Sequence, residues 1–207
     1  MPPGATAIEV IPGQYLSPLD PLRSPLAEWH FDEKIWDGAG GQVKESAGNV
    51  SGLHGTANSG ATTTSSGPVL DGSPGTGRSA AFSGSGQFVR VPSNAALHSD
   101  DFTIGAWVRP ATAVSADWRA VAVSRQTAGG QSTGYGLYAS PDGKWTFLTG
   151  PVWSPLTGPP LTAGQWSHVS ASFRTTSVSG SVRTGIRRIF VNGIQVAEDT
   201  GTCAAAP

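Results

Sequence analysis

The stretch Ser79–Pro110, SAAFSGSGQFVRVPSNAALHSDDFTIGAWVRP, decides the fold class of this chain. It contains two short runs rich in β-branched and aromatic residues, Phe88–Val91 and Phe102–Val108, joined by a polar connector. An alternation of residue types with a period of two is typical of a β-strand whose two faces meet different surroundings. In the second run, the residues expected on one common face are Phe102, Ile104, Ala106 and Val108.

Similar runs recur along the chain, and turn residues separate them. Pro141-Asp142-Gly143 and Asn192-Gly193 each stand between two alternating runs and predict β-hairpins, because Pro presets φ while Gly and Asn accept positive φ. No helical period of 3.6 persists, and roughly ten short strands predict an all-β sandwich or barrel. Residues 58–77, rich in Gly, Ser, Thr and Pro, are expected to form a surface loop, and further strands are expected at 26–33, 118–123 and 166–173.

Composition excludes several classes of protein. Charged residues make up only 13% of the 207 residues and the net charge is −1, so no basic surface for nucleic acid is expected. The adjacent Arg187 and Arg188 are interpreted as the polar edge of a strand. The hydrophobic fraction is 38% and no apolar run approaches 18 residues, so no membrane-spanning helix is expected.

The two ends of the chain differ from its middle. Six prolines in residues 1–25 make regular structure unfavourable there, and we interpret this segment as a linker or the remnant of a preceding region. The domain is expected at 26–198, followed by a C-terminal tail at 199–207. Cys203 is the only cysteine, so it cannot form an internal disulfide, and we expect it to lie outside the core.

The location of the protein is inferred from composition. The first residues lack the basic and apolar regions of a signal peptide. The chain is nevertheless poor in charge, rich in Ser, Thr and Gly, and contains seven tryptophans, as secreted bacterial modules often do. We therefore expect an extracellular or cell-surface location, as part of a longer exported protein.

Six motifs occur in an order that resembles the LamG-like, or concanavalin A-like, jelly-roll family. The resemblance covers about residues 26–198. It implies an antiparallel β-sandwich, and so favours the sandwich among the two architectures that the strand pattern allows. The motifs are LAEWHFDE, KESAGNVSGLHGTA, AAFSGSGQFVRVP with DFTIGAWVRP, GYGLYASPDGKWTF, AGQWSHVSASF and RRIFVNGIQVAE.

The chain departs from the family pattern at its end. Such domains usually close with a glycine-rich strand and a strand like I-D-E-V-R-I-Y, whereas this chain ends in GTCAAAP. The resemblance therefore implies that the final strands are lacking, so that one sheet edge stays open and the chain self-associates through it.

Many modules of this family bind Ca²⁺, which takes six to eight oxygen ligands. The candidate ligands here are Glu45 and Asn49 in the ESAGN loop. Two positions where the family carries acidic residues are Ser83 and Gln87 in this chain. The alternative is a turn in which Asn49 adopts left-handed geometry and Glu45 is solvated.

A sugar site pairs an exposed aromatic ring with convergent polar groups, because the C–H face of the sugar stacks on the ring. Trp153, in the loop GPVWSPLTGPP, is the first candidate for such a platform, and Trp36 and Trp145 are the others. Three other tryptophans, Trp29, Trp107 and Trp166, lie on expected strands and are expected in the core.

Catalysis is not expected. Related glucanases carry a strand of the type E-x-D-x-x-E, and no such triplet occurs here. Glu198 and Asp199 are adjacent and would face opposite sides of a strand. The resemblance therefore implies a non-catalytic module that binds a glycan or a cell-surface polysaccharide. The alternatives are a structural or protein-interaction spacer of a surface or pilus-associated protein, and an accessory domain of a glycoside hydrolase.

Overall fold

The computed structural model describes residues 25–68, 77–84, 86–128 and 130–204, and the chain divides into two compact units, residues 1–94 and 95–207. The predicted linker lies almost entirely outside the described residues. The division also differs from the single domain expected at 26–198.

The N-terminal unit has short strands and long loops. Two antiparallel pairs form in it: β1 (Thr56–Asn58) with β4 (Phe88–Arg90), and β2 (Thr62–Thr64) with β3 (Ser79–Ala81). The strand expected at 26–33 is wrong, because this segment makes only one isolated bridge, between Trp29 and Glu45. The expected loop at 58–77 is also wrong in part, since β2 lies within it.

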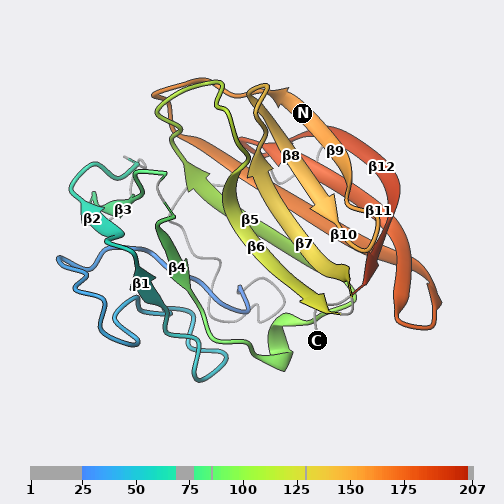
Figure 1. The fold of residues 1–207 in the computed structure, drawn as a ribbon, viewed down its shortest axis with the longest axis horizontal. Coiled ribbons are helices and arrows are strands. Elements are labelled where there is room, and N and C mark those ends of the chain that lie inside the picture. The colour runs from blue at the N-terminus through green and yellow to red at the C-terminus, as the bar shows by residue number, and fades with distance from the viewer. Residues whose placement is uncertain (1–24, 69–76, 85, 129, 205–207) are drawn as a thin grey trace, which may run out of the picture. The chain divides into compact units, whose positions relative to one another are not determined.

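The C-terminal unit is a β-sandwich of two four-stranded antiparallel sheets, as the sequence predicts (Figure 1). The first, which we call the β5–β12 sheet, has the order β12-β11-β10-β5. The second, the β6–β9 sheet, has the order β6-β7-β8-β9. Their strands are β5 (Phe102–Val108), β6 (Arg119–Ala128), β7 (Gln131–Ala139), β8 (Lys144–Thr149), β9 (Ser154–Pro160), β10 (Ser167–Ser179), β11 (Val182–Val191) and β12 (Ile194–Ala204).

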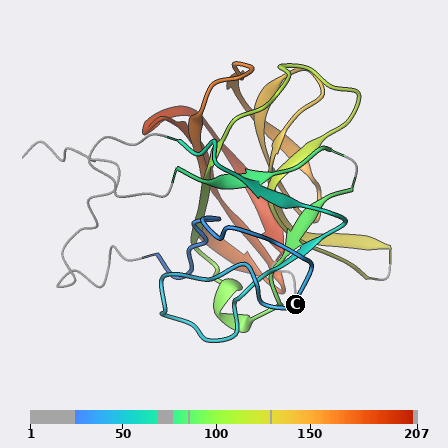
Figure 2. The same cartoon turned by 90° about the vertical axis from the view of Figure 1, so that its left-hand side faces the viewer.

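The two sheets form separate layers, which Figure 2 shows turned by 90°. A 3₁₀ helix, η1 (Ala95–Leu97), precedes β5. The core lies between the layers and combines inward residues of both sheets, among them Leu137, Trp145, Phe147, Val169 and Ile189. Burial of such side chains, roughly 1.5–3 kcal/mol each, is what holds the layers together.

Both predicted hairpins are confirmed. β7 and β8 flank residues 140–143, where Gly143 has φ +79°. β11 and β12 flank Asn192 and Gly193, with φ of +50° and +79°. Positive φ at both central residues matches the twist of the strands, which explains why Asn-Gly stands there.

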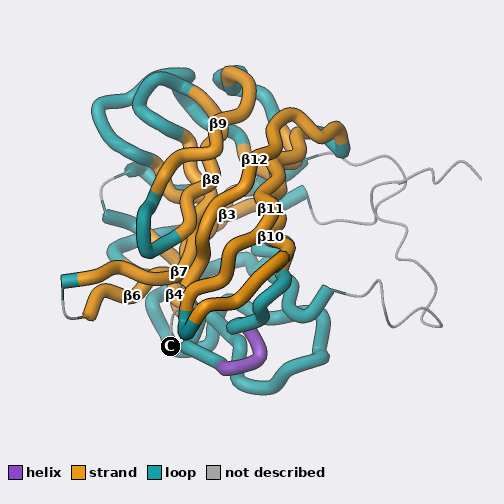
Figure 3. Tube along the Cα trace, turned by 90° about the vertical axis from the view of Figure 1, so that its right-hand side faces the viewer, coloured by secondary structure: helices purple, strands orange, loops and turns teal. Residues whose placement is uncertain are grey.

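The predicted tail is wrong. β12 continues to Ala204 and pairs along its length with β11, whose neighbour on the other side is β10 (Figure 3). Cys203 is therefore buried in the unit and not outside the core, as expected from its position near the end. β12 forms one edge of its sheet. Self-association through such an edge stays a prediction.

Candidate functional site

The outer face of the β6–β9 sheet carries a row of aromatic and cationic side chains. Strand parity places them there. On β7, Leu137 and Ala139 are buried in the core, so Gly136 and Tyr138 face outward. β6 pairs with β7 so that Ala120 lies opposite Tyr138, and Val123 lies opposite Gly136.

We call this set the aromatic row and define it as Trp118, Tyr138, Arg125 and Trp153. Trp118 meets Tyr138 edge-on, with ring centroids 5.7 Å apart. The Arg125 guanidinium lies over the Trp153 ring, 4.9 Å from its centroid. Trp118 is 47% exposed and Arg125 is exposed as well. The row is therefore open to ligands.

Tyr138 connects the two halves of the row. Its ring occupies the space above the backbone of Gly136, because a Cβ at that position would overlap the ring and approach the hydroxyl. Burial raises the pKa of Tyr138, while the charge of Arg125 and a hydrogen bond from it oppose that rise. The hydroxyl stays protonated near neutral pH and can both donate and accept hydrogen bonds.

Arg125 and Trp153 are held in place by Ser132. The Trp153 Nε1–H donates to the Ser132 carbonyl at 2.9 Å, and Arg125 Nη2 donates to the Ser132 hydroxyl at 3.0 Å. Ser132 lies on β7, opposite Thr127 on β6. These bonds orient both side chains without a carboxylate, so the positive charge of Arg125 is not neutralised by the bonds that fix it.

Trp153 has an unusual backbone. Its φ is +56°, in the left-handed region where bulky residues are uncommon, and its N–H donates to the Thr149 carbonyl at 2.9 Å. Strained backbone of this kind persists where the surroundings fix it, and it is frequent at functional sites. The conformation turns the indole toward β7 and Arg125.

The other two predicted platforms are not available to a ligand. Trp145 is 1% exposed in the core of the sandwich, and Trp36 is 7% exposed in the core of the N-terminal unit. A ring without an exposed face cannot stack on a sugar, so the predictions for these two residues are wrong. Trp107 was expected in the core, and this prediction is wrong, because its side chain is 37% exposed and contacts His168.

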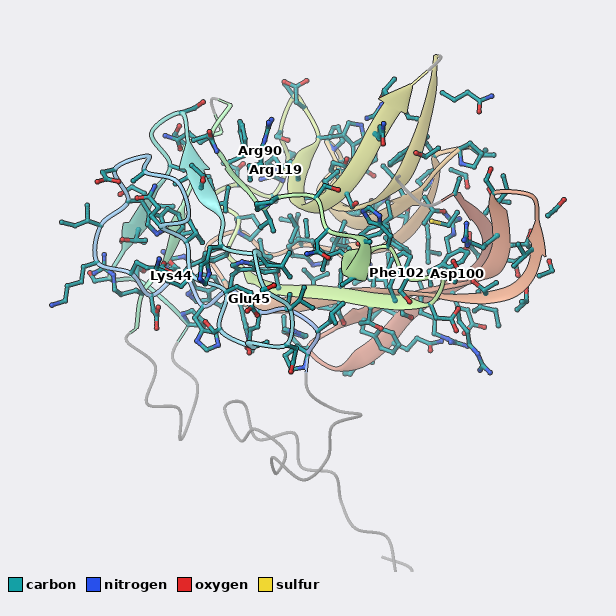
Figure 4. The ribbon with its side chains drawn as sticks, turned by 90° about the horizontal axis from the view of Figure 1, so that it is seen from below. Lys44, Glu45, Arg90, Asp100, Phe102 and Arg119 are labelled. Carbon is teal, nitrogen blue, oxygen red and sulfur yellow. The ribbon has the colours of Figure 1, made fainter. Side chains whose placement is uncertain are left out.

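The ESAGN loop is organised by Glu45. Its Oε1 accepts the backbone N–H groups of Ala47 at 2.7 Å and Glu28 at 3.1 Å, and its Oε2 accepts that of Gly48 at 3.0 Å. Desolvation, the largest single influence, raises the pKa of Glu45. The three hydrogen bonds and His54 outweigh it, so the pKa is lowered. Figure 4 labels Glu45 beside Lys44.

Both predicted calcium ligands make hydrogen bonds to the backbone, and calcium binding at this loop stays a prediction. The Asn49 Nδ2 donates to the Pro25 carbonyl at 2.7 Å, which orients the amide and leaves Oδ1 as the atom that calcium would use. The Glu45 oxygens already accept three backbone bonds. Among the described residues, no group of three or more His, Cys, Asp or Glu side chains could hold a metal ion.

Comparison with known proteins adds the family. A family model described as the concanavalin A-like lectin/glucanases superfamily matches residues 83–207. The chain belongs to this superfamily. No curated protein and no solved structure matches the chain.

The superfamily match covers the whole sandwich, including β12 to its end. It starts later than the resemblance at 26–198, so the motifs LAEWHFDE and KESAGNVSGLHGTA lie outside it. Within the part of the chain that the structure describes, no helix is long and apolar enough to cross a membrane.

Both carboxylates of β12 form ion pairs with arginines of β11, whereas the glucanase strand described above uses its carboxylates for catalysis. Glu198 pairs with Arg188 on the exposed side, and Asp199 pairs with the buried Arg187. This confirms that the two adjacent acids face opposite sides of the strand. It also corrects the interpretation of Arg187 as a polar strand edge, since this side chain is 1% exposed.

A small pocket lies elsewhere in the sandwich, beside η1, where Figure 4 labels Asp100 and Phe102. Its volume is about 10 Å³, comparable to the space that one water molecule requires. Cys203 and Tyr135 also line it. It is too small for a sugar ring, so the open aromatic row is the better candidate for a binding site.

Of the four residues in the aromatic row, the sequence analysis named only Trp153 as a candidate, and whether Trp153 binds a ligand stays a prediction. One signal for Tyr138 was present in GYGLYA, where glycines alternate with the core residues and leave bare backbone on the face that Tyr138 shares. The proximity of Arg125 to Trp153 depends on strand register, which the sequence does not display.

Proposed function

We propose that this chain is a non-catalytic carbohydrate-binding module, and that a glycan lies along the outer face of the β6–β9 sheet. The observation that carries the proposal is the aromatic row. Exposed rings offer flat apolar faces for the C–H side of sugars, while Tyr138 and Arg125 offer hydrogen-bonding groups beside them. Membership of a superfamily named for lectins and glucanases agrees with this function.

The roles within the row differ. Trp118 is the main stacking platform, because its ring is the most exposed in the row. Arg125 covers one face of Trp153, so Trp153 supports Arg125 as well as offering its remaining surface. Trp118 and Arg125 are seven residues apart, about 20 Å along a strand, a span that suits an oligosaccharide better than a single sugar.

The exported, extracellular location is part of the same proposal. A module that binds polysaccharide through an open surface works where such polymers are found, outside the cell. The low charge and the abundance of Ser, Thr and Gly in the chain agree with that setting.

The test is binding to immobilised neutral and acidic glycans, with affinities then measured by calorimetry. Trp118→Ala and Trp153→Ala should each weaken binding at least tenfold. Trp107→Ala is the matched control, since Trp107 is also exposed but lies on the other sheet. Equal losses in all three variants, or no glycan binding by the folded chain, would contradict the proposal and favour a protein-interaction spacer.

A further inference from the structure

We infer that the aromatic row selects anionic polysaccharides, with Arg125 as the residue that recognises the carboxylate or sulfate group. This inference deepens the proposed function and rests on it. It comes from the distribution of charge on the β6–β9 sheet and from the way in which Arg125 is held.

The charges of this sheet have one sign. Strands β6–β9 contain three basic residues, Arg119, Arg125 and Lys144, and no Asp or Glu. The β5–β12 sheet differs, because β12 carries two acids that pair with two of its four arginines: Arg188 pairs with Glu198, and Arg187 with Asp199. Arg125 and Lys144 lie on the outer face, whereas Arg119 lies opposite the core residue Ala139 and so faces inward. The charge that the strands place on the outer face is still positive, which favours anions.

The three cations of this sheet are not equally available. Lys144 pairs with Asp142 at 2.9 Å. Arg119 donates to the carbonyls of Thr112 at 2.7 Å and Ala113 at 2.8 Å, and so closes the loop before β6. Arg125 is exposed, and no ion pair joins it to a carboxylate within the described residues. It is the cation that a ligand can reach.

The Arg125 guanidinium is pre-oriented. The Trp153 ring supports its flat face, and the hydroxyls of Ser132 and Tyr138 each accept a hydrogen bond from it. A guanidinium has five N–H groups, so N–H groups remain for a ligand. A guanidinium presents its donors in a fork that fits a carboxylate or sulfate, and hydrogen bonds to charged groups are the stronger ones. Because the group is already held, less side-chain entropy is lost on binding.

A polysaccharide fits this face better than another polyanion. Trp118 and Tyr138 provide exposed ring surface next to the cation, and sugars offer C–H faces to match. An acidic polypeptide would use the charge of Arg125 but not the rings in the same way. The ligand class is thus a chain of sugars that carry carboxylate or sulfate groups.

The experiment compares polygalacturonate with its methyl ester, which keeps the sugar chain and removes the charge. The full chain should bind polygalacturonate at least tenfold more tightly, and added salt should reduce this preference. Arg125→Gln should abolish the preference, and Arg125→Lys should retain part of it. Arg174→Gln, at an exposed arginine of β10, is the control and should leave the preference intact.

Alginate and chondroitin sulfate extend the acidic panel, and poly-L-glutamate tests for charge alone. Equal or tighter binding of the methyl ester would overturn the inference but leave carbohydrate binding standing. Binding of poly-L-glutamate as tight as that of the acidic glycans would also overturn it. Failure of the folded chain to bind any acidic glycan would also overturn the inference. Binding to neutral glycans would then test the proposed carbohydrate-binding function separately.

Discussion

Arg187 on β11 is joined to Asp199 on β12 by two hydrogen bonds, from Nε to Oδ1 at 2.8 Å and from Nη2 to Oδ2. The guanidinium is 1% exposed, and its Nη1 also donates to the Ser154 carbonyl at 2.8 Å. Arg187 thus links the β5–β12 sheet to β9 of the opposite sheet. A buried charge of this kind is tolerated only when its donors are satisfied.

Asp199→Ala should lower the free energy of unfolding by about 3 kcal/mol, since it leaves the buried Arg187 without its counter-ion. Arg187→Met should cost less, because Asp199 is 37% exposed and water can solvate it. Urea unfolding measures both. The exposed pair Arg188–Glu198 is the control, and its removal should cost about 1 kcal/mol or less. Similar losses from both pairs would contradict this account.

Replacing Gly201 should also destabilise the sandwich, because Gly201 packs against the Arg187 guanidinium. A Cβ at this position would overlap Nε and Cζ of Arg187. We expect Gly201→Ala to destabilise the sandwich in urea, whereas Gly193→Ala at the hairpin should act through its φ of +79° alone, since open space surrounds it. Combining Gly201→Ala with Arg187→Met should remove most of the Gly201 penalty, and an additive result would show that the two positions are not coupled.

The ESAGN loop should depend on pH through Glu45. Its pKa is lowered in the folded chain, so the carboxylate contributes stability above its ordinary value of 4.5, and this contribution is lost as the pH falls through the folded value. The melting temperature of Glu45→Gln should therefore change less than that of the wild type on acidification from neutral pH. Parallel curves for the two proteins would show that Glu45 is not responsible.

Calcium should have no effect on this loop. The melting temperature should be the same in millimolar calcium and in EDTA, because both Glu45 oxygens already accept backbone N–H groups. Calorimetric titration with calcium should give no binding heat. A clear stabilisation by calcium that Glu45→Gln removes would revive the metal site.

Cys203 should be unreactive. Burial raises the pKa of its thiol from 9.0 to about 11, so little thiolate forms near pH 8, and access is restricted as well. The stabilising effect of the neutral thiol is complete below pH 9 and is lost as the pH rises toward 11. A disulfide reagent should react slowly until denaturant is added. Ser181→Cys in a Cys203→Ala chain is the exposed control, and comparable native rates would contradict the prediction.

The parts of the fold that sequence predicts are those with local causes. Asn192-Gly193 predicts a hairpin because only such residues take its backbone angles easily. The alternation in Phe102–Val108 predicts two faces, and the half-buried and exposed positions follow it. The same alternation puts Trp107 on the face opposite Phe102, so its exposure could have been predicted from parity.

Features that depend on contacts between distant segments could not be predicted. Arg187 and Arg188 look alike in sequence, and only the register with Asp199 and Glu198 shows which one is buried. Cys203 is buried because β12 extends past the expected boundary. The candidate site follows the same rule: Trp153 stood out by itself, whereas Arg125 and Tyr138 became relevant through the pairing of β6 with β7.

The Tyr138 ring lies where a side chain at position 136 would be, so the two positions share one volume. A larger residue at 136 would require a smaller or differently directed residue at 138. In related sequences these two positions should therefore change together, with glycine accompanying an aromatic residue. Such covariation would allow a search for aromatic rows of this kind in other sandwiches from sequence alone.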